Sequence, residues 1–450
     1  MGRADSDIGG RRRPIRRASA IGLAALLAAS AGAGEGRLIA SPEAGWPQWR
    51  GPRRDGISDE TGLLQSWPEG GPRLLWKASG LGRGYSSPII VGGRIYITGD
   101  VGQELLVYAF DLDGKRLWRT ANGKAWRKSH PGARACCAYS DGRLYHMNAH
   151  GRVACLDPAS GKEVWAADVL GRFGGKVINW GLSECLLVDG PRVVVTPGGT
   201  KALMAALDKK TGATVWASEP LTFERTVKFG GKPLPEPVTE ADKAGYAPPI
   251  LFELGGRRHI VSCSARHAFG VDADTGKLLW TLPLPTRHEV LSTTPLLCRD
   301  SVLVRGSNGK GSKLLRIRAD GGQMAPEEAW TTPLDTTHYA AVLVDGRIYG
   351  GWYRGPAHWA CIEPETGAVL HQTRDVQPGP VLYADGCLYC LGQDGEAALL
   401  EPTPDGFEVK GRFRLIEQRK KDAWAHPVIL DGHLYLRYHD ALYCYDIKAK

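Results

Sequence analysis

Short apolar runs separated by glycine-containing turns recur along most of the chain. Residues 88–91 and 94–97, for example, are β-rich runs on either side of a Gly-Gly turn. Asp-Gly or Gly-Gly between two such runs predicts a two-residue β-hairpin, because glycine adopts positive φ without steric cost. Eight copies of this turn occur 40 to 66 residues apart, with the second turn residue at Gly93, Gly142, Gly190, Gly256, Ser301 (a degenerate copy), Gly346, Gly386 and Gly432.

A second hairpin motif follows the first in most copies. It places an acidic residue first, a glycine next and a tryptophan last, as in Asp157, Gly161 and Trp165. The aspartate side chain caps such a turn, and the glycine takes its left-handed position. Related copies are Asp111 to Trp118, Asp208 to Trp216, Asp272 to Trp280, and Glu363 to His371, in which histidine replaces the tryptophan.

Two hairpins per repeat amount to about four strands, and four-stranded repeats of ~40–50 residues are typical of β-propellers. We therefore predict an all-β fold with eight four-stranded blades, and expect the tryptophans to pack between neighbouring blades. Seven blades is the alternative, if two degenerate copies between residues 285 and 390 share one blade. The longest gap contains a Lys-, Glu- and Pro-rich stretch, residues 219–245, which is either a lid over the channel or a solvated insertion.

The two ends of the repeat region complement each other. The last repeat, from Trp424 to Asp446, lacks its tryptophan-bearing strand, and residues 72–76 form such a strand with nothing before it. The N-terminal strand near Trp76 is thus predicted to pair with the C-terminal blade and close the ring.

Composition and charge narrow the classes of function. The chain has 450 residues, 43% of them hydrophobic, which excludes a disordered, collagen-like or coiled-coil protein. It contains no apolar run of ~20 residues, so no transmembrane helix is expected. The net charge is +9, of which the first 33 residues carry +4. The remaining surplus is mild for so long a chain, and we expect no nucleic-acid partner.

The N-terminal segment has the pattern of a targeting signal. A dense arginine block at residues 11–17 precedes an apolar stretch over residues 18–29 and then small residues. This order predicts a secretory signal peptide over residues 1–33 and a periplasmic or secreted protein, the alternative being a tail without a targeting role. Residues 34–70 are interpreted as an extended arm along the rim, anchored by Trp46, Trp49 and Trp67, and residues 71–450 as the propeller.

The repeat motif resembles that of a known superfamily. Residues 271–280 nearly match the tryptophan-docking repeat of the pyrroloquinoline quinone (PQQ)-like β-propellers, and residues 46–51, 180–184 and 424–427 resemble a bacterial exported subgroup. The superfamily includes PQQ-dependent quinoprotein alcohol dehydrogenases and the non-enzymatic BamB-type outer-membrane assembly scaffold. The resemblance implies the fold; function depends on individual sites.

Candidate site residues follow from the geometry of a propeller, in which the innermost strand of each blade lines the central channel. In this chain that strand lies just before each Asp-Gly turn. Polar residues at or near these positions predict a channel that binds a polar ligand or a divalent cation. They are Ser87, Glu184, Thr294, His338 and His426.

The adjacent pair Cys136-Cys137 is the most specific local motif in the sequence. In quinoprotein alcohol dehydrogenases a similar pair covers one face of the quinone, and the resemblance implies the same role here, with Trp180 on the other face. The alternative is that the two thiols point to opposite faces of a strand. Those enzymes also need calcium held by carboxylate and amide oxygens, a set that no stretch of this sequence matches.

Two hypotheses of function result. The first is a binding or scaffold protein with a ligand site in the channel and a protein partner in the cell envelope. The second is a quinoprotein oxidoreductase acting on alcohols or polyols, with PQQ and calcium as cofactors. In the second hypothesis Cys136, Cys137 and Trp180 bind the quinone, and Glu184 with His338 or His426 serves as metal ligand or base.

Overall fold

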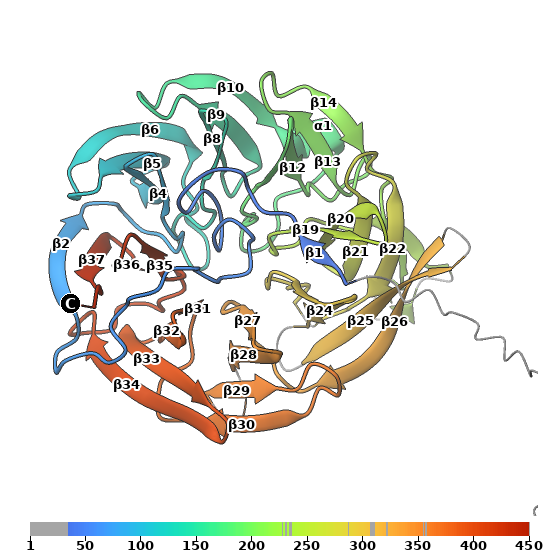
Figure 1. The fold of residues 1–450 in the computed structure, drawn as a ribbon. Helices are drawn as coiled ribbons and strands as arrows, with labels where there is room; N and C mark the ends of the chain where they lie inside the picture. The colour runs from blue at the N-terminus through green and yellow to red at the C-terminus, as the bar shows by residue number, and fades with distance from the viewer. Residues whose placement is uncertain are drawn as a thin grey trace, which may run out of the picture. The chain divides into compact units, whose positions relative to one another are not determined.

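The repeats form a ring of eight β-sheets around a central axis (Figure 1). The computed structural model describes residues 35–226, 228–229, 232–233, 236–286, 288–306, 311–320, 323–353, 355 and 358–449. The sheets within these residues confirm the predicted all-β propeller with eight four-stranded blades. The predicted signal peptide lies outside the described residues.

Each blade is an antiparallel meander whose first strand is innermost (Figure 1). Blade 1 consists of β3 (Ile89–Val91), β4 (Arg94–Val101), β5 (Glu104–Asp111) and β6 (Arg116–Lys124). Blade 2 consists of β7 (Ala138–Ser140), β8 (Arg143–Met147), β9 (Arg152–Leu156) and β10 (Glu163–Asp168). Blade 3 consists of β11 (Leu187–Asp189), β12 (Arg192–Val195), β13 (Ala205–Asp208) and β14 (Thr214–Ala217). Blade 4 consists of β19 (Ile250–Leu254), β20 (Arg257–Cys263), β21 (His267–Asp272) and β22 (Leu278–Pro283), extended by β1 (Arg37–Leu38).

The second half of the ring repeats this plan. Blade 5 consists of β23 (Leu296–Cys298), β24 (Ser301–Arg305), β25 (Ser312–Asp320) and β26 (Gln323–Thr332). Blade 6 consists of β27 (Ala341–Val344), β28 (Arg347–Gly351), β29 (Trp359–Ile362) and β30 (Val369–Thr373). Blade 7 consists of β31 (Val381–Ala384), β32 (Cys387–Leu391), β33 (Glu396–Thr403) and β34 (Gly406–Arg414). Blade 8 combines β35 (Val428–Leu430), β36 (His433–Tyr438) and β37 (Ala441–Asp446) with β2 (Arg73–Ser79) from the other end of the chain.

Blade 8 closes the ring. Strand β2 pairs antiparallel with β37 and places Trp76 opposite Cys444. The N-terminal strand therefore supplies the outermost strand that the last repeat lacks.

The innermost hairpins have the two-residue turns that the sequence indicates. Asp141 and Gly142, for example, connect β7 to β8, and both have positive φ. Two copies differ in position. In blade 3 Asp189 pairs with Arg192, so the turn residues are Gly190 and Pro191, one position later than the sequence indicates. In the degenerate copy Cys298 pairs with Ser301, so the turn residues are Arg299 and Asp300, one position earlier. Arg299 takes the positive φ that glycine or aspartate adopts elsewhere.

Tryptophans on outer strands join adjacent blades. The indole of Trp165 in blade 2 lies against Gly212 in the second turn of blade 3. Four indole N–H groups donate to backbone carbonyls of the next blade: Trp76 to Leu112 at 2.7 Å, Trp118 to Pro158 at 3.1 Å, Trp165 to Lys209 at 3.0 Å and Trp330 to Pro364 at 2.8 Å. The acid–glycine–tryptophan motif is thus a contact between blades.

Few elements lie outside the blades. Helix α1 (Val169–Phe173) follows blade 2. The insertion before blade 4 forms two small hairpins, β15 (Thr222–Arg225) with β18 (Val238–Ala241) and β16 (Lys228–Phe229) with β17 (Lys232–Pro233). Within the described residues, no helix has both the length and the apolar character needed to cross a membrane.

Candidate functional site

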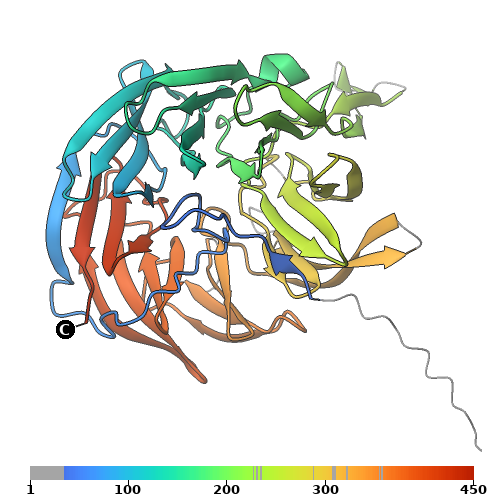
Figure 2. The ribbon, with the colours of Figure 1, turned by 45° about the horizontal axis from the view of Figure 1, so that its top comes forward.

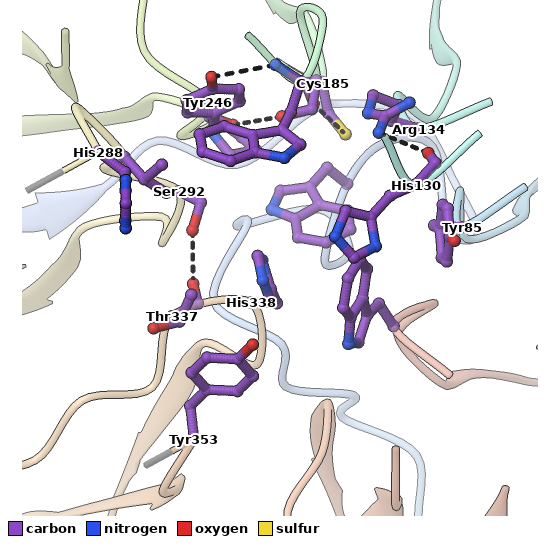
Figure 3. Close-up of a pocket in the computed structure, with 16 residues that line it drawn as sticks. Tyr85, His130, Arg134, Cys185, Tyr246, His288, Ser292, Thr337, His338 and Tyr353 are labelled. Carbon is purple, nitrogen blue, oxygen red and sulfur yellow. Dashed lines mark hydrogen bonds between the residues drawn. The ribbon is translucent and has the colours of Figure 1, made fainter. Parts of the chain in front are cut away.

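A cavity of about 340 Å³ opens at the end of the channel where the innermost strands begin (Figure 3). Its lining comes from the arm, from segments that lead into seven of the eight blades, and from the loop after β28. The lining residues are Trp49, Tyr85, His130, Arg134, Trp180, Ser183, Cys185, Tyr246, Pro248, His288, Val290, Ser292, Thr337, His338, Tyr353 and Trp424. Its volume lies in the range of small-ligand pockets.

The N-terminal arm runs into the middle of the ring (Figure 2). It contributes Trp49, which we call the floor of the cavity. Its indole N–H donates to the Thr294 hydroxyl at 2.9 Å. Its ring packs edge-on against His426, with centroids 4.5 Å apart. Trp46 and Trp67 pack in a hydrophobic cluster with residues of the blades, whereas Trp49 lines the cavity.

Two buried arginines beneath Trp49 attach the arm to the innermost strands. Arg54 donates to the carbonyls of Pro249 at 2.7 Å, Leu186 at 3.1 Å and Cys185 at 2.8 Å, and to the Gln48 side chain at 3.1 Å. Arg50 donates to the Ala341 carbonyl at 2.6 Å. Both have φ of 60°, a left-handed conformation that turns the arm sharply. The arm closes one end of the channel, and the cavity is a cup.

Aromatic rings form the wall on the side of blade 8. Trp424 is in ring contact with His338 at 4.4 Å, Tyr85 at 4.9 Å and His130 at 5.2 Å between centroids. Trp180, in the segment that leads into blade 3, lies near Tyr246 and His288, with ring centroids 6.2 Å apart in both pairs. The cup therefore offers flat apolar surfaces on its floor and on its sides.

Arg134 supplies the positive charge of the cup. Its guanidinium donates to the carbonyls of Gly132 and His130, both at 2.8 Å, and lies 5.4 Å from the Trp126 ring. Burial lowers the pKa of Arg134 to about 10, so it remains charged at neutral pH. Burial and the charge of Arg134 also lower the pKa of His130. No Asp or Glu is among the lining residues, all of which the structure describes.

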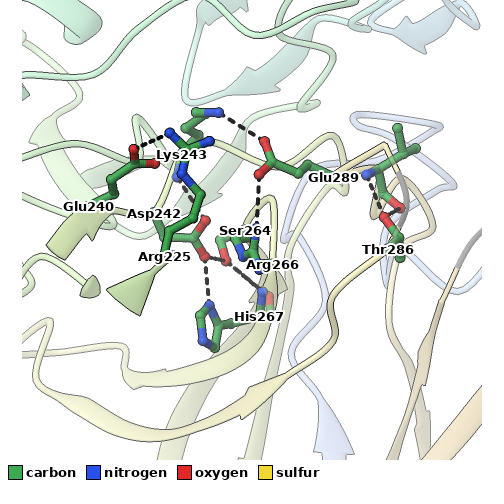
Figure 4. A network of polar contacts seen from close by, with 10 residues as sticks. Arg225, Glu240, Asp242, Lys243, Ser264, Arg266, His267, Thr286 and Glu289 are labelled. Atoms are coloured by element: carbon green, nitrogen blue, oxygen red, sulfur yellow. Dashed lines mark hydrogen bonds and ion pairs between the residues drawn. The ribbon is translucent and has the colours of Figure 1, made fainter. Parts of the chain in front are cut away.

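A polar network holds the loop that carries His288 (Figure 4). Glu289 accepts hydrogen bonds from Lys243 at 2.9 Å and from Arg266 at 3.1 Å. Next to Lys243, Asp242 accepts a hydrogen bond from His267 Nδ1 at 2.8 Å. These contacts connect the base of the insertion, the outer strands of blade 4 and the wall of the cup, and we conclude that they keep His288 in place.

The structure brings some of the predicted site residues together and separates others. His338 and Trp180 line the cup. His426 lies just beneath it, where its ring contacts Trp49 and its Nε2 donates to the His338 carbonyl at 3.4 Å. The Ser87 hydroxyl accepts a hydrogen bond from the His426 backbone N–H at 2.7 Å.

The two predicted cysteines are buried beside the cup but are not among its lining residues. All ten cysteines of the chain lie in the described part and are free thiols. Of these, Cys185 is the one that lines the cavity. Its sulfur accepts a hydrogen bond from the Cys136 backbone N–H at 3.2 Å.

Glu184 faces the interior of blade 3. Its carboxylate accepts hydrogen bonds from the Thr196 backbone N–H at 2.9 Å and from the Thr196 hydroxyl at 2.8 Å. Burial raises the pKa of Glu184 to about 7, although the Thr196 contacts and Arg54 oppose the shift. This acid is therefore a pH-sensitive element of the blade.

Stability is expected to fall as Glu184 ionises. The folded-state pKa of Glu184 is about 7, above the unfolded value of about 4.3. Its contribution to the free energy of unfolding is therefore complete below pH 4.3 and is lost as the pH rises to 7. Against Glu184→Gln, the wild type should lose up to about 3 kcal/mol of unfolding free energy between pH 4.5 and 7. Urea unfolding at both pH values measures this loss. An equal change in the free energy of unfolding with pH in the wild type and in Glu184→Gln would contradict the prediction.

Several lining residues were missed from the sequence, and one rule recovers them. Tyr85, Arg134, Ser292 and Trp424 each lie two residues before a position considered above, at Ser87, Cys136, Thr294 and His426. These pairs lie just before the innermost strands, and the alternation of an extended chain puts residues two apart on the same side. The upstream member of each pair is closer to the mouth and lines the cup.

The residues present do not fit a metal-bound quinone. Calcium and related hard cations take carboxylate and carbonyl oxygens as ligands. The cup has no carboxylate, and Glu184 is engaged with Thr196 inside its blade. Within the described residues, no group of three or more His, Cys, Asp and Glu side chains is arranged to hold a metal ion.

Comparison with known families agrees with the fold. Residues 103–373, more than half of the chain, match the family model described as outer membrane protein assembly factor BamB. The crystal structure of BamB from Moraxella catarrhalis covers 84% of this chain and 98% of its own, with a TM-score of 0.54 and 14% identity. The quinohemoprotein alcohol dehydrogenase from Comamonas testosteroni covers 90% and 81%, with a TM-score of 0.59 and 12% identity. At these identities the structures show the fold alone.

Curated relatives are similar over part of their length. BamB from Alkalilimnicola ehrlichii is 27% identical over 36% of this chain and 39% of its own. The lanthanide-dependent methanol dehydrogenase from Methylacidiphilum fumariolicum is 29% identical over 32% of this chain and 25% of its own. This chain thus spans less than half the length of these two relatives.

Proposed function

Since this chain belongs to the PQQ-like repeat family of the outer membrane protein assembly factor BamB, we propose that it is an exported binding and scaffold protein whose cup holds a flat organic anion. The observation that carries the proposal is the lining of the cup. Aromatic rings form its floor and sides, Arg134 is its cation, and it has no acid.

Each part of the lining selects a property of the ligand. Trp49 and Trp424 present ring faces or edges to a planar ligand, and such contacts contribute about 0.5–1.5 kcal/mol each beyond area burial. Arg134 forms charge-assisted hydrogen bonds with a carboxylate or a similar anion. The arginines of the arm, Arg50 and Arg54, add positive charge below the floor. A flat aromatic or quinoid carboxylate satisfies all three features.

The scaffold role rests on the family. An assembly factor acts through protein partners, and a ring of eight blades leaves two faces of loops for them. We propose a partner in the cell envelope, because the N-terminal segment predicts that the chain is exported. The partner surface is separate from the cup, because the cup is a small, partly enclosed pocket.

The alternative is a quinoprotein oxidoreductase acting on alcohols or polyols. Its support is the similarity to methanol and alcohol dehydrogenases. The lining argues against it, because a cup without a carboxylate offers neither a ligand set for calcium nor a carboxylate base. No catalytic step is derived from this arrangement.

Calorimetric titration with 2,6-naphthalenedicarboxylate tests the cup directly. We expect binding that weakens by about 10–100-fold in Arg134→Gln, because a hydrogen bond to a charged group contributes about 1.5–3 kcal/mol. Arg119→Gln is the matched control, since Arg119 is exposed on β6. The neutral dimethyl ester should bind as weakly to the wild type as the diacid does to Arg134→Gln. Equal binding of the diacid and the diester by the wild type would contradict the proposal, as would equal affinity of Arg134→Gln and Arg119→Gln for the diacid.

A further inference from the structure

We propose that Cys185 is a peroxide-reactive thiol of the cup and that Cys136 is its resolving partner, so that oxidation joins blades 2 and 3 through a Cys136–Cys185 disulfide. The inference is independent of which ligand the cup binds. It also differs from the role that the resemblance to quinoproteins implies for Cys136 and Cys137, which is to cover one face of a quinone.

The geometry places the two sulfurs together. Cys136 precedes β7 and Cys185 precedes β11, so they lie on neighbouring inner segments of blades 2 and 3. The Cys136 backbone N–H donates to Cys185 Sγ at 3.2 Å, and the Cys185 thiol is 3.9 Å from the Ser183 carbonyl oxygen. Cys185 also lines the cavity with 2% of its surface exposed, and this edge is where a small oxidant in the cup would reach it.

The surroundings favour the thiolate of Cys185. Burial alone would raise its pKa, but the two hydrogen bonds from Cys136 and the charge of Arg54 lower the pKa below its ordinary value. Burial raises the pKa of Cys136, and its thiol remains the donor of the pair. Burial also raises the pKa of Cys137. Since the thiolate is the reactive form, Cys185 is the nucleophile of the three.

The reaction is balanced with hydrogen peroxide as the oxidant. The Cys185 thiolate attacks one peroxide oxygen, the O–O bond breaks, and the leaving hydroxide takes up a proton to form water, which leaves a sulfenic acid on Cys185. The Cys136 sulfur then attacks the Cys185 sulfur, the S–O bond breaks, and a second water leaves with the thiol proton. Two thiols are oxidised by two electrons, and one peroxide is reduced to two waters.

Mass spectrometry of the reduced and desalted protein tests the proposal. One equivalent of hydrogen peroxide should remove two thiols, lower the mass by about 2 Da and yield a cross-linked peptide pair containing Cys136 and Cys185. The peptide with Cys136 also holds Cys137, so variants assign the bond. Cys137→Ser should keep the cross-link, and Cys136→Ser and Cys185→Ser should both lose it.

A second measurement separates reactivity from folding. In native protein, a brief pulse of iodoacetamide should label Cys185 at least about tenfold faster than Cys137, and Cys136→Ser treated with peroxide should trap dimedone at Cys185. Circular dichroism of each variant checks that the blades are intact. A vicinal Cys136–Cys137 bond, or equal labelling of Cys185 and Cys137 in folded protein, would overturn the proposal.

Discussion

Gly212→Ala is expected to lower the free energy of unfolding by about 3–4 kcal/mol, because the new methyl group would collide with the tryptophan that joins blades 2 and 3. A Cβ at Gly212 would lie 2.6 Å from Trp165 Cε3, closer than carbon atoms approach without displacement. Overpacking of this kind costs about 1–3 kcal/mol, and the left-handed backbone at φ of 71° adds about 1–2 kcal/mol for any residue with a Cβ.

Gly142→Ala is the matched control for this prediction. Gly142 has nearly the same φ, 69°, but no atom lies within 4 Å of its added Cβ. It should cost only the backbone share, about 1–2 kcal/mol. Urea unfolding followed by tryptophan fluorescence measures both. Equal losses would mean that the docking of Trp165 on Gly212 does not constrain the ring.

Arg54→Met is expected to destabilise the protein by about 3 kcal/mol. Arg54 is buried and donates four hydrogen bonds, three to carbonyls of blades 3 and 4 and one to Gln48. Methionine fills similar space but leaves these acceptors without their donor, at a cost of about 1–3 kcal/mol for each that water does not reach. Arg54→Met also removes the buried charge of the guanidinium, which recovers part of this cost. The expected net loss of unfolding free energy is therefore moderate.

The neighbouring arginine provides the control for the arm. Arg53 forms ion pairs with Asp55 at 2.8 Å and Asp59 at 2.6 Å, and about 30% of its side chain is exposed. Such pairs contribute about 0–1 kcal/mol, so Arg53→Met should lose less than about 1 kcal/mol. Thermal and urea unfolding of the two variants decide. A loss in Arg53→Met as large as in Arg54→Met would show that the arm is not held by its buried arginine.

The blades could be predicted from sequence because their determinants are local. Asp141-Gly142 selects a two-residue turn whatever surrounds it, and the spacing from Asp157 to Trp165 sets the second hairpin of the same blade. The strand around Trp76 was recognisable because a blade that lacks an outer strand must find one elsewhere.

The cup could be predicted only in part, because it depends on contacts between distant segments. His338 and Trp180 could be predicted, because His338 lies near an inner strand and Trp180 lies in the motif of residues 180–184. Trp49 was assigned to the rim, because residues 46–56 have no periodicity and their course depends on carbonyls at Cys185, Pro249 and Ala341. The partner of Cys185 was hidden for the same reason: Cys136 lies 49 residues away in the sequence.

The location of a bound anion tests the central claim, that the arm turns the propeller channel into an aromatic, cationic cup. We would determine the crystal structure of the protein with 2,6-naphthalenedicarboxylate. The account predicts density for the rings above Trp49, between the sides formed by Trp180 and Trp424, with a carboxylate on the Arg134 guanidinium. Density for the ligand elsewhere on the protein, with the cup filled by water alone, would contradict it.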